Sequence, residues 1–153
     1  MSAVLKPAPS FEPMTEADLL AVLEIEKSIY AFPWTPGNFQ DSLRAGYSCW
    51  VYRDGEVLIG YAILMLASGE AHLLNLSVAG HAQRRGHGRM LLDNVVGVAR
   101  EYGAKVLFLE VRPSNKVGQR LYVRYGFKQV GVRRSYYPDH RGREDALVLA
   151  LFL

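Results

Sequence analysis

The hydrophobic pattern of this chain changes its period at the segment Gln83-Arg84-Arg85-Gly86-His87-Gly88. Residues 71–78, which lie just before this segment, form an apolar run of the β type. After Gly88 the apolar residues recur on one helical face, and Gly103 stands where a helix-terminating glycine is expected. The residues on this face are Leu91, Val95, Val98, Ala99 and Tyr102. A strand, a basic glycine-rich turn and a helix in this order favour a mixed α/β fold.

The same segment has the chemistry of an anion-binding site. Its glycines allow backbone N–H groups to approach a ligand closely, and the helix N-terminus adds a partial positive charge. Arg84, Arg85 and Arg89 add full positive charges. We therefore predict a phosphate or pyrophosphate site, although a basic turn without a ligand would show the same pattern. Neither standard nucleotide loop, G-x-x-x-x-G-K-S/T or G-x-G-x-x-G directly after the strand, is present.

The remaining patterns predict two N-terminal helices, a three-stranded antiparallel meander, a helix, a strand, a helix and two final strands. A short extra strand is expected near Phe11. The expected helices cover residues 15–29, 36–45, 89–102 and 116–125, and the expected strands cover 48–53, 57–67, 71–78, 106–111, 130–136 and 146–153. Residues 106–111 are nearly all apolar, which predicts a strand buried on both faces. A polar loop is expected between the last two strands.

Length and composition limit the class of protein. The chain has 153 residues, which suits one domain over residues 10–153 behind a flexible tail at 1–9. Cys49 is the only cysteine, which favours a reducing, cytoplasmic environment. No secretory leader or membrane span is expected, and the net charge of +3 is weak evidence for nucleic-acid binding. The histidines at 72, 81, 87 and 140 lack metal-ligand spacing, so no metal is expected.

The segment 83–88 resembles the acetyl-CoA pyrophosphate loop of the GNAT family of N-acetyltransferases. The resemblance continues along the chain in Leu109-Glu110-Val111-Arg112, Asn115, Leu121-Tyr122 and Gly126-Phe127, and it covers about residues 10–153. It implies the GNAT fold, in which a mostly antiparallel central sheet is flanked by helices, with acetyl-CoA as the cosubstrate. Two departures are Ala79-Gly80, where many relatives have Asp-Pro, and Gly118, which replaces a common alanine and should weaken its helix.

Three further segments resemble the bacterial ribosomal-protein alanine N-acetyltransferases, the RimI type, within that family. They are Phe32-Pro33-Trp34, Tyr136-Tyr137-Pro138 and Gly142-Arg143-Glu144-Asp145-Ala146. The resemblance implies acetylation of the N-terminal alanine of a small-subunit ribosomal protein. It requires no membrane and no direct contact with nucleic acid.

The resemblance also implies roles for individual residues. Glu110 would be the general base and Tyr122 the general acid. The expected cofactor-binding residues are Leu76, Ser77, Val78, Arg84, Arg85, Gly86, His87, Gly88, Arg89 and Asn115, and the expected substrate-binding residues are Trp34, Tyr136, Tyr137 and Glu144.

The residues support this chemistry but leave alternatives open. A carboxylate such as Glu110 can deprotonate an amine, yet it could also be a structural acid at the end of a strand. Tyr122 lies two helical turns after Asn115, where a phenol could protonate a leaving thiolate or simply pack. Asn115 could instead cap the helix. The aromatic residues could line a peptide groove or belong to the core, and Glu144 could bind an ammonium group or solvate a loop.

Two other functions remain open at this stage. The same fold could acetylate a small-molecule amine or a lysine side chain. A protein α-amine has a pKa near 8 and a lysine about 10.4, so the α-amine loses its proton at neutral pH for roughly 3 kcal/mol less. The chain could also be a basic RNA- or ribosome-binding module without catalysis, which would bind RNA in a salt-sensitive way and would not bind acetyl-CoA. The arginines available for that role are Arg84, Arg85, Arg89, Arg133, Arg134, Arg141 and Arg143.

Overall fold

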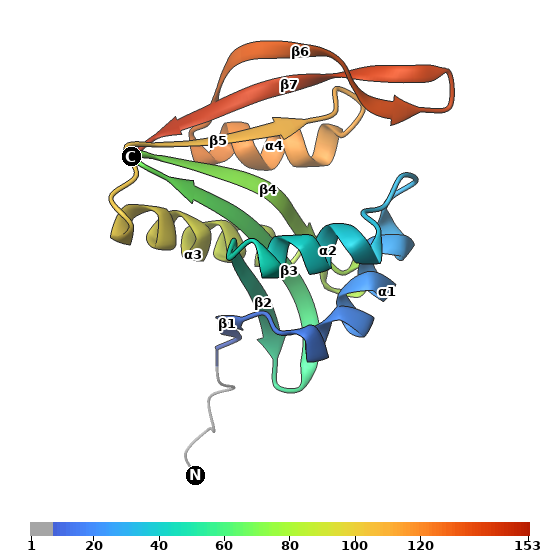
Figure 1. The fold of residues 1–153 in the computed structure, drawn as a ribbon, viewed down its shortest axis with the longest axis vertical. Helices are drawn as coiled ribbons and strands as arrows, with labels where there is room; N and C mark the ends of the chain where they lie inside the picture. Colours follow the sequence, from blue (N-terminus) through green and yellow to red (C-terminus); the bar gives the residue numbers. More distant parts are fainter. Residues whose placement is uncertain (1–7) are drawn as a thin grey trace.

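A computed structural model describes residues 8–153, which form one seven-stranded sheet with helices packed against it (Figure 1). The strands are β1 (Ser10–Pro13), β2 (Ser48–Asp54), β3 (Val57–Ala67), β4 (Glu70–Val78), β5 (Val106–Val111), β6 (Lys128–Asp139) and β7 (Gly142–Phe152). The helices are α1 (Leu19–Ile29), α2 (Pro36–Arg44), α3 (His87–Glu101) and α4 (Lys116–Tyr125), and short 3-10 turns cover Glu16–Asp18 and Gly80–Ala82. The strand order is β1-β2-β3-β4-β5-β7-β6.

The observed elements confirm the predicted mixed α/β fold, because the order of helices and strands follows the sequence pattern along the chain. Every neighbouring pair of strands is antiparallel except β4 and β5. The predicted tail at residues 1–9 lies largely outside the described residues, and the extra strand expected near Phe11 is β1.

Three expectations were wrong in detail. The last two strands are longer than predicted, and β6 and β7 form one hairpin in place of a polar loop, because backbone pairing continues where side chains on both faces are exposed. Tyr102 is 58% exposed, since it lies beyond the last helical turn that the sheet covers. β5 is fully buried on one face only, where Leu107, Leu109 and Val111 point, because Phe108 and Glu110 on its other face line a hollow that is open to solvent.

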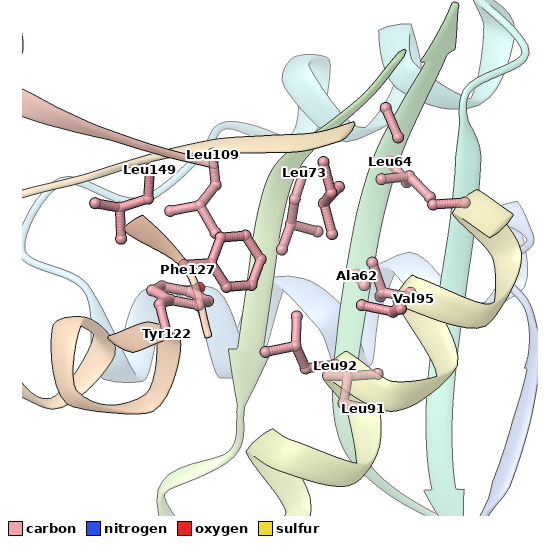
Figure 2. Packing of buried hydrophobic residues seen from close by; sticks show 14 of the residues in the cluster. Ala62, Leu64, Leu73, Leu91, Leu92, Val95, Leu109, Tyr122, Phe127 and Leu149 are labelled. Atoms are coloured by element: carbon pink, nitrogen blue, oxygen red, sulfur yellow. The ribbon is translucent and has the colours of Figure 1, made fainter. Parts of the chain in front are cut away.

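Strand alternation divides the buried residues between two clusters on opposite faces of the sheet. In β3, Ala62 and Leu64 join the cluster beneath α3 and α4, whereas Tyr61 and Ile63 join the cluster beneath α1 and α2. Figure 2 shows part of the first cluster, where Val95 of α3 lies beside Ala62 of β3, and Phe127 lies between Tyr122 of α4 and Leu109 of β5.

The central feature of the sheet is a divergence of β4 from β5. Their parallel pairing ends at Leu73 and Leu109, and from this point the two strands run apart (Figure 1). A bulge in β4 marks the same place, because Ile63 pairs with Asn75 while Leu64 pairs with Leu73, which leaves Leu74 without a partner in β3. The far part of β4 stays paired with β3, and Glu110 and Val111 of β5 stay paired with β7. The sheet therefore opens at its centre.

Two helical glycines yield a stability prediction. A Cβ added at Gly97 in α3 would meet nothing within 4 Å, so Gly97→Ala should raise the free energy of unfolding by up to about 1 kcal/mol. A Cβ added at Gly118 would lie 2.6 Å from Asn115 Nδ2, whose side chain caps α4 by accepting a hydrogen bond from the Gly118 N–H at 2.9 Å. Loss of such a cap costs about 1 kcal/mol, so Gly118→Ala should not stabilise the protein. Denaturant unfolding checks both variants, and equal stabilisation by both would contradict this explanation of Gly118.

Candidate active site

The gap between β4 and β5 exposes backbone groups at the edge of β4. The Ala79 N–H donates to the Ile59 carbonyl at 2.9 Å, and hydrogen-bonded pairs alternate along an antiparallel ladder. The amides of Leu76 and Val78 therefore turn away from β3 towards the open edge. The Val78 carbonyl accepts a hydrogen bond from Gln83 Nε2 at 3.0 Å, and the Leu76 carbonyl lies 3.5 Å from the Tyr30 hydroxyl. An extended ligand could pair with this edge as a strand would.

The basic segment 83–88 connects the end of β4 to the N-terminus of α3. Arg84 and Gly86 both have positive φ, at 64° and 80°, and this left-handed turn brings the chain into the helix. Gly86 is the N-cap residue and offers no side-chain cap, and the first turn of α3 contains no acidic residue. The N–H groups of the first helical turn form the positive end of α3, which thus lies beside the exposed arginines at 84, 85 and 89.

His87 and Gly88 fix the position of this segment. The His87 ring contacts the Tyr52 ring edge-on at 5.8 Å between centroids, so the imidazole packs inward. Its Nδ1 is buried without a hydrogen-bond partner among the residues that the structure describes. A Cβ at Gly88 would lie 3.3 Å from Leu121 Cδ2, which shows how closely the start of α3 approaches α4.

Glu110 lies on β5 just beyond the last pair that β5 makes with β4, and its side chain is 7% exposed. Its carboxylate has two partners. Arg133 Nε lies 3.1 Å from Oε1, and His72 Nε2 shares a hydrogen bond with Oε2. All three side chains line a hollow of about 300 Å³ on the face of the sheet opposite α3 and α4. The carboxylate is thus held in place, at a point where solvent can reach it.

Tyr122 enters the same region from α4, on the other face of the sheet. Its ring packs against Phe127 at 5.5 Å and the residue is buried. Burial, together with the nearby Tyr30 and Tyr137, raises the pKa of Tyr122 far above its ordinary value of 10. The phenol is therefore protonated at neutral pH, and its hydroxyl makes no hydrogen bond within residues 8–153. Such a hydroxyl is free to donate to a ligand.

The predicted substrate residues lie where the segment after α1 meets the β6–β7 hairpin. Arg112 joins the two, because its guanidinium lies 4.3 Å from the Tyr137 ring centroid and 5.4 Å from that of Phe32. Tyr136 is 41% exposed and contacts Tyr137 edge-on. Aromatic side chains from two separate segments thus come together beside Glu110.

Trp34, Glu144 and Asn115 have structural partners. The Trp34 ring packs against Phe39 at 5.1 Å and belongs to the cluster beneath α1 and α2. The Glu144 carboxylate accepts hydrogen bonds from the Ser114 N–H and hydroxyl at 2.9 and 3.0 Å. It also lies 3.7 Å from Arg112. Asn115 caps α4, as the alternative interpretation of that residue held.

A buried carboxylate that the sequence interpretation did not include lies beside the gap. Glu26 of α1 is 2% exposed and accepts hydrogen bonds from the Trp34 N–H, the Tyr61 hydroxyl and the Asn75 amide at 2.8–3.0 Å. The network continues from Asn75 through the Ser77 hydroxyl at 2.7 Å to the Tyr30 hydroxyl at 2.6 Å. An acid on the same helical face as Leu19 and Val22 is the signal that could have revealed Glu26.

Metal-binding clusters and membrane-spanning helices are both absent from residues 8–153. No group of three or more histidine, cysteine, aspartate or glutamate side chains in this part of the chain could hold a metal ion. No helix among the same residues has both the length and the apolar character needed to cross a membrane.

Comparison with known proteins agrees with this geometry. The pattern of the Acetyltransferase (GNAT) family matches residues 19–127. The ribosomal protein bS18-alanine N-acetyltransferase of Salmonella typhimurium is 36% identical over 138 residues, which cover 90% of this chain and 93% of that protein.

Solved structures show the same likeness. The crystal structure of the ribosomal-protein-S18-alanine N-acetyltransferase from Escherichia coli has a TM-score of 0.87 at 34% identity and covers 94% of this chain and 93% of that chain. The structure of Arabidopsis thaliana NAA60 in complex with acetyl-CoA has a TM-score of 0.83 at 20% identity, over 95% and 99% of the two chains, and shows a shared fold.

Proposed function

Because this chain belongs to the GNAT family of acetyltransferases, we propose that it transfers the acetyl group of acetyl-CoA to the N-terminal alanine of ribosomal protein bS18. The observation that carries the substrate assignment is the 36% identity to the Salmonella typhimurium bS18-alanine N-acetyltransferase along 90% of the chain. A ribosomal substrate implies that the enzyme acts in the cytoplasm, which the single cysteine also favours.

We expect acetyl-CoA to bind along the open edge of β4 and at the N-terminus of α3. The pantetheine arm of acetyl-CoA contains amides, and the backbone N–H groups of Leu76 and Val78, which face the open edge, would donate to it as in a strand pair. Arg84, Arg85 and Arg89 surround the helix N-terminus, which suits the pyrophosphate. Gly86 places no side chain at the N-cap of α3, and Gly88 lets the start of α3 approach Leu121 closely. Asn115 Nδ2 stays a predicted donor beside the thioester.

Glu110 and Tyr122 lie on opposite faces of the gap and suit opposite proton transfers. Bound acetyl-CoA supplies a thioester carbonyl as the electrophile. Glu110 would take a proton from the α-ammonium group, directly or through a water, so that the neutral amine can attack. Tyr122 would donate its proton to the departing sulfur, because its raised pKa keeps the phenol protonated and its hydroxyl has no other partner.

The acceptor would enter from the side of the β6–β7 hairpin, between Tyr136 and Tyr137 and the segment that contains Phe32. Glu144 stays a predicted contact for the ammonium group, and Trp34 supports the segment from beneath. The structure gives less support to a non-catalytic RNA-binding module. Arg133 pairs with Glu110, and Arg143 donates to the Ser135 and Tyr136 carbonyls, so neither is free for phosphates.

A peptide panel tests the substrate. A peptide that begins with the bS18 N-terminal alanine should be acetylated at its α-amine, and the same peptide with a blocked N-terminus and a free lysine should react far more slowly. Mass spectrometry of each product identifies the acetylated nitrogen. Faster reaction of lysine or of a free polyamine would move the assignment to another GNAT substrate class without affecting the fold.

Gly86 offers a matched test of the cofactor site. Asn and Asp have the same shape and both tolerate a positive φ, so Gly86→Asn and Gly86→Asp should strain the turn alike. Only Asp places a negative charge at the expected pyrophosphate, so acetyl-CoA affinity should fall much further in Gly86→Asp. Calorimetric titration measures both dissociation constants. Equal affinities in the two folded variants would show that phosphate does not bind there.

Tyr122→Phe should lower kcat by ~10²-fold or more while acetyl-CoA affinity stays within about twofold, because charge on sulfur develops only during the reaction. The ring keeps its contact with Phe127, and the lost hydroxyl has no hydrogen bond in the protein, so thermal stability should not fall. Steady-state kinetics, cofactor titration and thermal unfolding give the three readings. A loss of cofactor binding with an unchanged kcat would make Tyr122 a packing residue.

A further inference from the structure

His72 is the residue next to Glu110 that the proposed mechanism does not use. In the parallel pairing of β4 and β5, His72 is opposite Phe108, and Glu110 lies two residues further along β5 on the same face. His72 Nε2 shares a hydrogen bond with Glu110 Oε2 on the side away from the open part of the gap. The His72 side chain is 22% exposed, whereas that of Glu110 is 7% exposed, so solvent reaches the imidazole more readily than the carboxylate.

The two oxygens of Glu110 have different kinds of partner. Arg133 stands at Oε1 and keeps its positive charge at every accessible pH, whereas a histidine changes charge between about pH 5 and 8. The other titratable groups near this pair are Glu70, which lines the same hollow, and Tyr136 and Tyr137 of β6, whose pKa values Glu110 helps to raise. The remaining residues that line the hollow from β3, β4, β5 and β7 are uncharged: Met65, Ala67, Ala71, Phe108 and Val148.

We propose that His72 is a positioning residue that acts through Glu110: it holds the carboxylate beside the gap, and its charge sets how readily Glu110 accepts a proton. When His72 is protonated, both carboxylate oxygens face a cation and the base is weakened. When His72 is neutral, only Arg133 opposes the incoming proton. This inference rests on the proposed role of Glu110 as the base.

The charge beside Glu110 matters because acetylation of an α-ammonium group releases a proton at this site. During acetylation the nitrogen of an α-ammonium group loses two protons and forms one bond to the carbonyl carbon. The electron pair of the broken carbon–sulfur bond goes to sulfur, which receives one proton from Tyr122, and Tyr122 is then reprotonated. One proton therefore leaves the site in every turnover. Glu110 is the group that takes protons from nitrogen, and the hollow beside His72 connects it to solvent.

The test is the pH dependence of kcat for the full chain, with saturating acetyl-CoA and acceptor peptide, between about pH 5.5 and 9. Gln at position 72 keeps an amide donor for Glu110 but cannot become charged. His72→Gln should raise kcat at pH 6 about tenfold over the wild type, the size expected from removing one opposite charge within hydrogen-bonding reach of a carboxylate. The two proteins should converge near pH 8.5. Glu70→Gln is the matched control, since it removes a charge from the same hollow without a contact to Glu110, and its profile should follow the wild type.

The double variant His72→Gln/Glu110→Gln shows whether His72 acts through Glu110. In the Glu110→Gln background, His72→Gln should leave the shape of the pH profile unchanged. A uniform loss of kcat at every pH in His72→Gln, or a pH effect that persists without Glu110, would overturn the proposal. His72→Asn, with unfolding measured for each variant, separates a folding defect from a change in chemistry.

These measurements test the role of His72, the role of Glu110 and the choice of substrate separately. If Glu110→Gln alone retains full kcat at pH 7, then Glu110 is not the base and the role of His72 is overturned with it. If the alanine peptide is not a substrate, the substrate assignment fails, and the pH profiles are measured with whichever amine in the panel reacts.

Discussion

The divergence of β4 from β5 is the constraint on which the rest of the site depends. The one parallel pair among the strands of residues 8–153 stops at Leu73 and Leu109, and the bulge at Leu74 turns the end of β4 away. A strand edge that loses its neighbour leaves N–H and C=O groups that must be satisfied by something else. Here the open edge of β4 meets the first turn of α3, so that the chain presents a free strand edge and a free helix N-terminus together. The proposed cofactor, which has amides at one end and phosphates at the other, would satisfy both.

Polar contacts hold the chain in place on both sides of the gap, and those on the side of β4 are buried. On the side of β4, the Glu26 carboxylate accepts from three uncharged donors that come from β3, from β4 and from the segment after α1. Each donor would be costly to leave unpaired in a buried place, so the three segments keep one arrangement. On the side of β5, Glu144 holds the Ser114 backbone and hydroxyl, and Arg112 stacks on Tyr137. The start of α4, and with it Tyr122, is thereby fixed across the gap from Tyr30.

The sequence predicted the elements well because their patterns are local. Residues 57–67 and 116–125 follow the expected bounds, since apolar periodicity and the turn residues beside them identify these elements without tertiary information. The basic turn before α3 was predictable for the same reason. The pairing of Glu110 with His72 and Arg133 was not, because it joins β4, β5 and β6, which only the folded sheet brings together. The full length of the β6–β7 hairpin was missed because its exposed end has no apolar pattern, and backbone hydrogen bonds carry no signature in the side chains.

The two faces of the sheet give Tyr122 and Glu110 different electrostatic environments. On the face of α3 and α4, Tyr122 lies among apolar side chains that favour the neutral phenol. On the opposite face, the Glu110 carboxylate contacts the guanidinium of Arg133 and the imidazole of His72. A protein that must add a proton on one side of a reacting bond and remove one on the other needs two such environments close together. A continuous sheet would separate them by a layer of paired backbone. Because β4 and β5 part at this point, a reacting group in the gap can approach Tyr122, the proposed acid, from one face and Glu110, the proposed base, from the other.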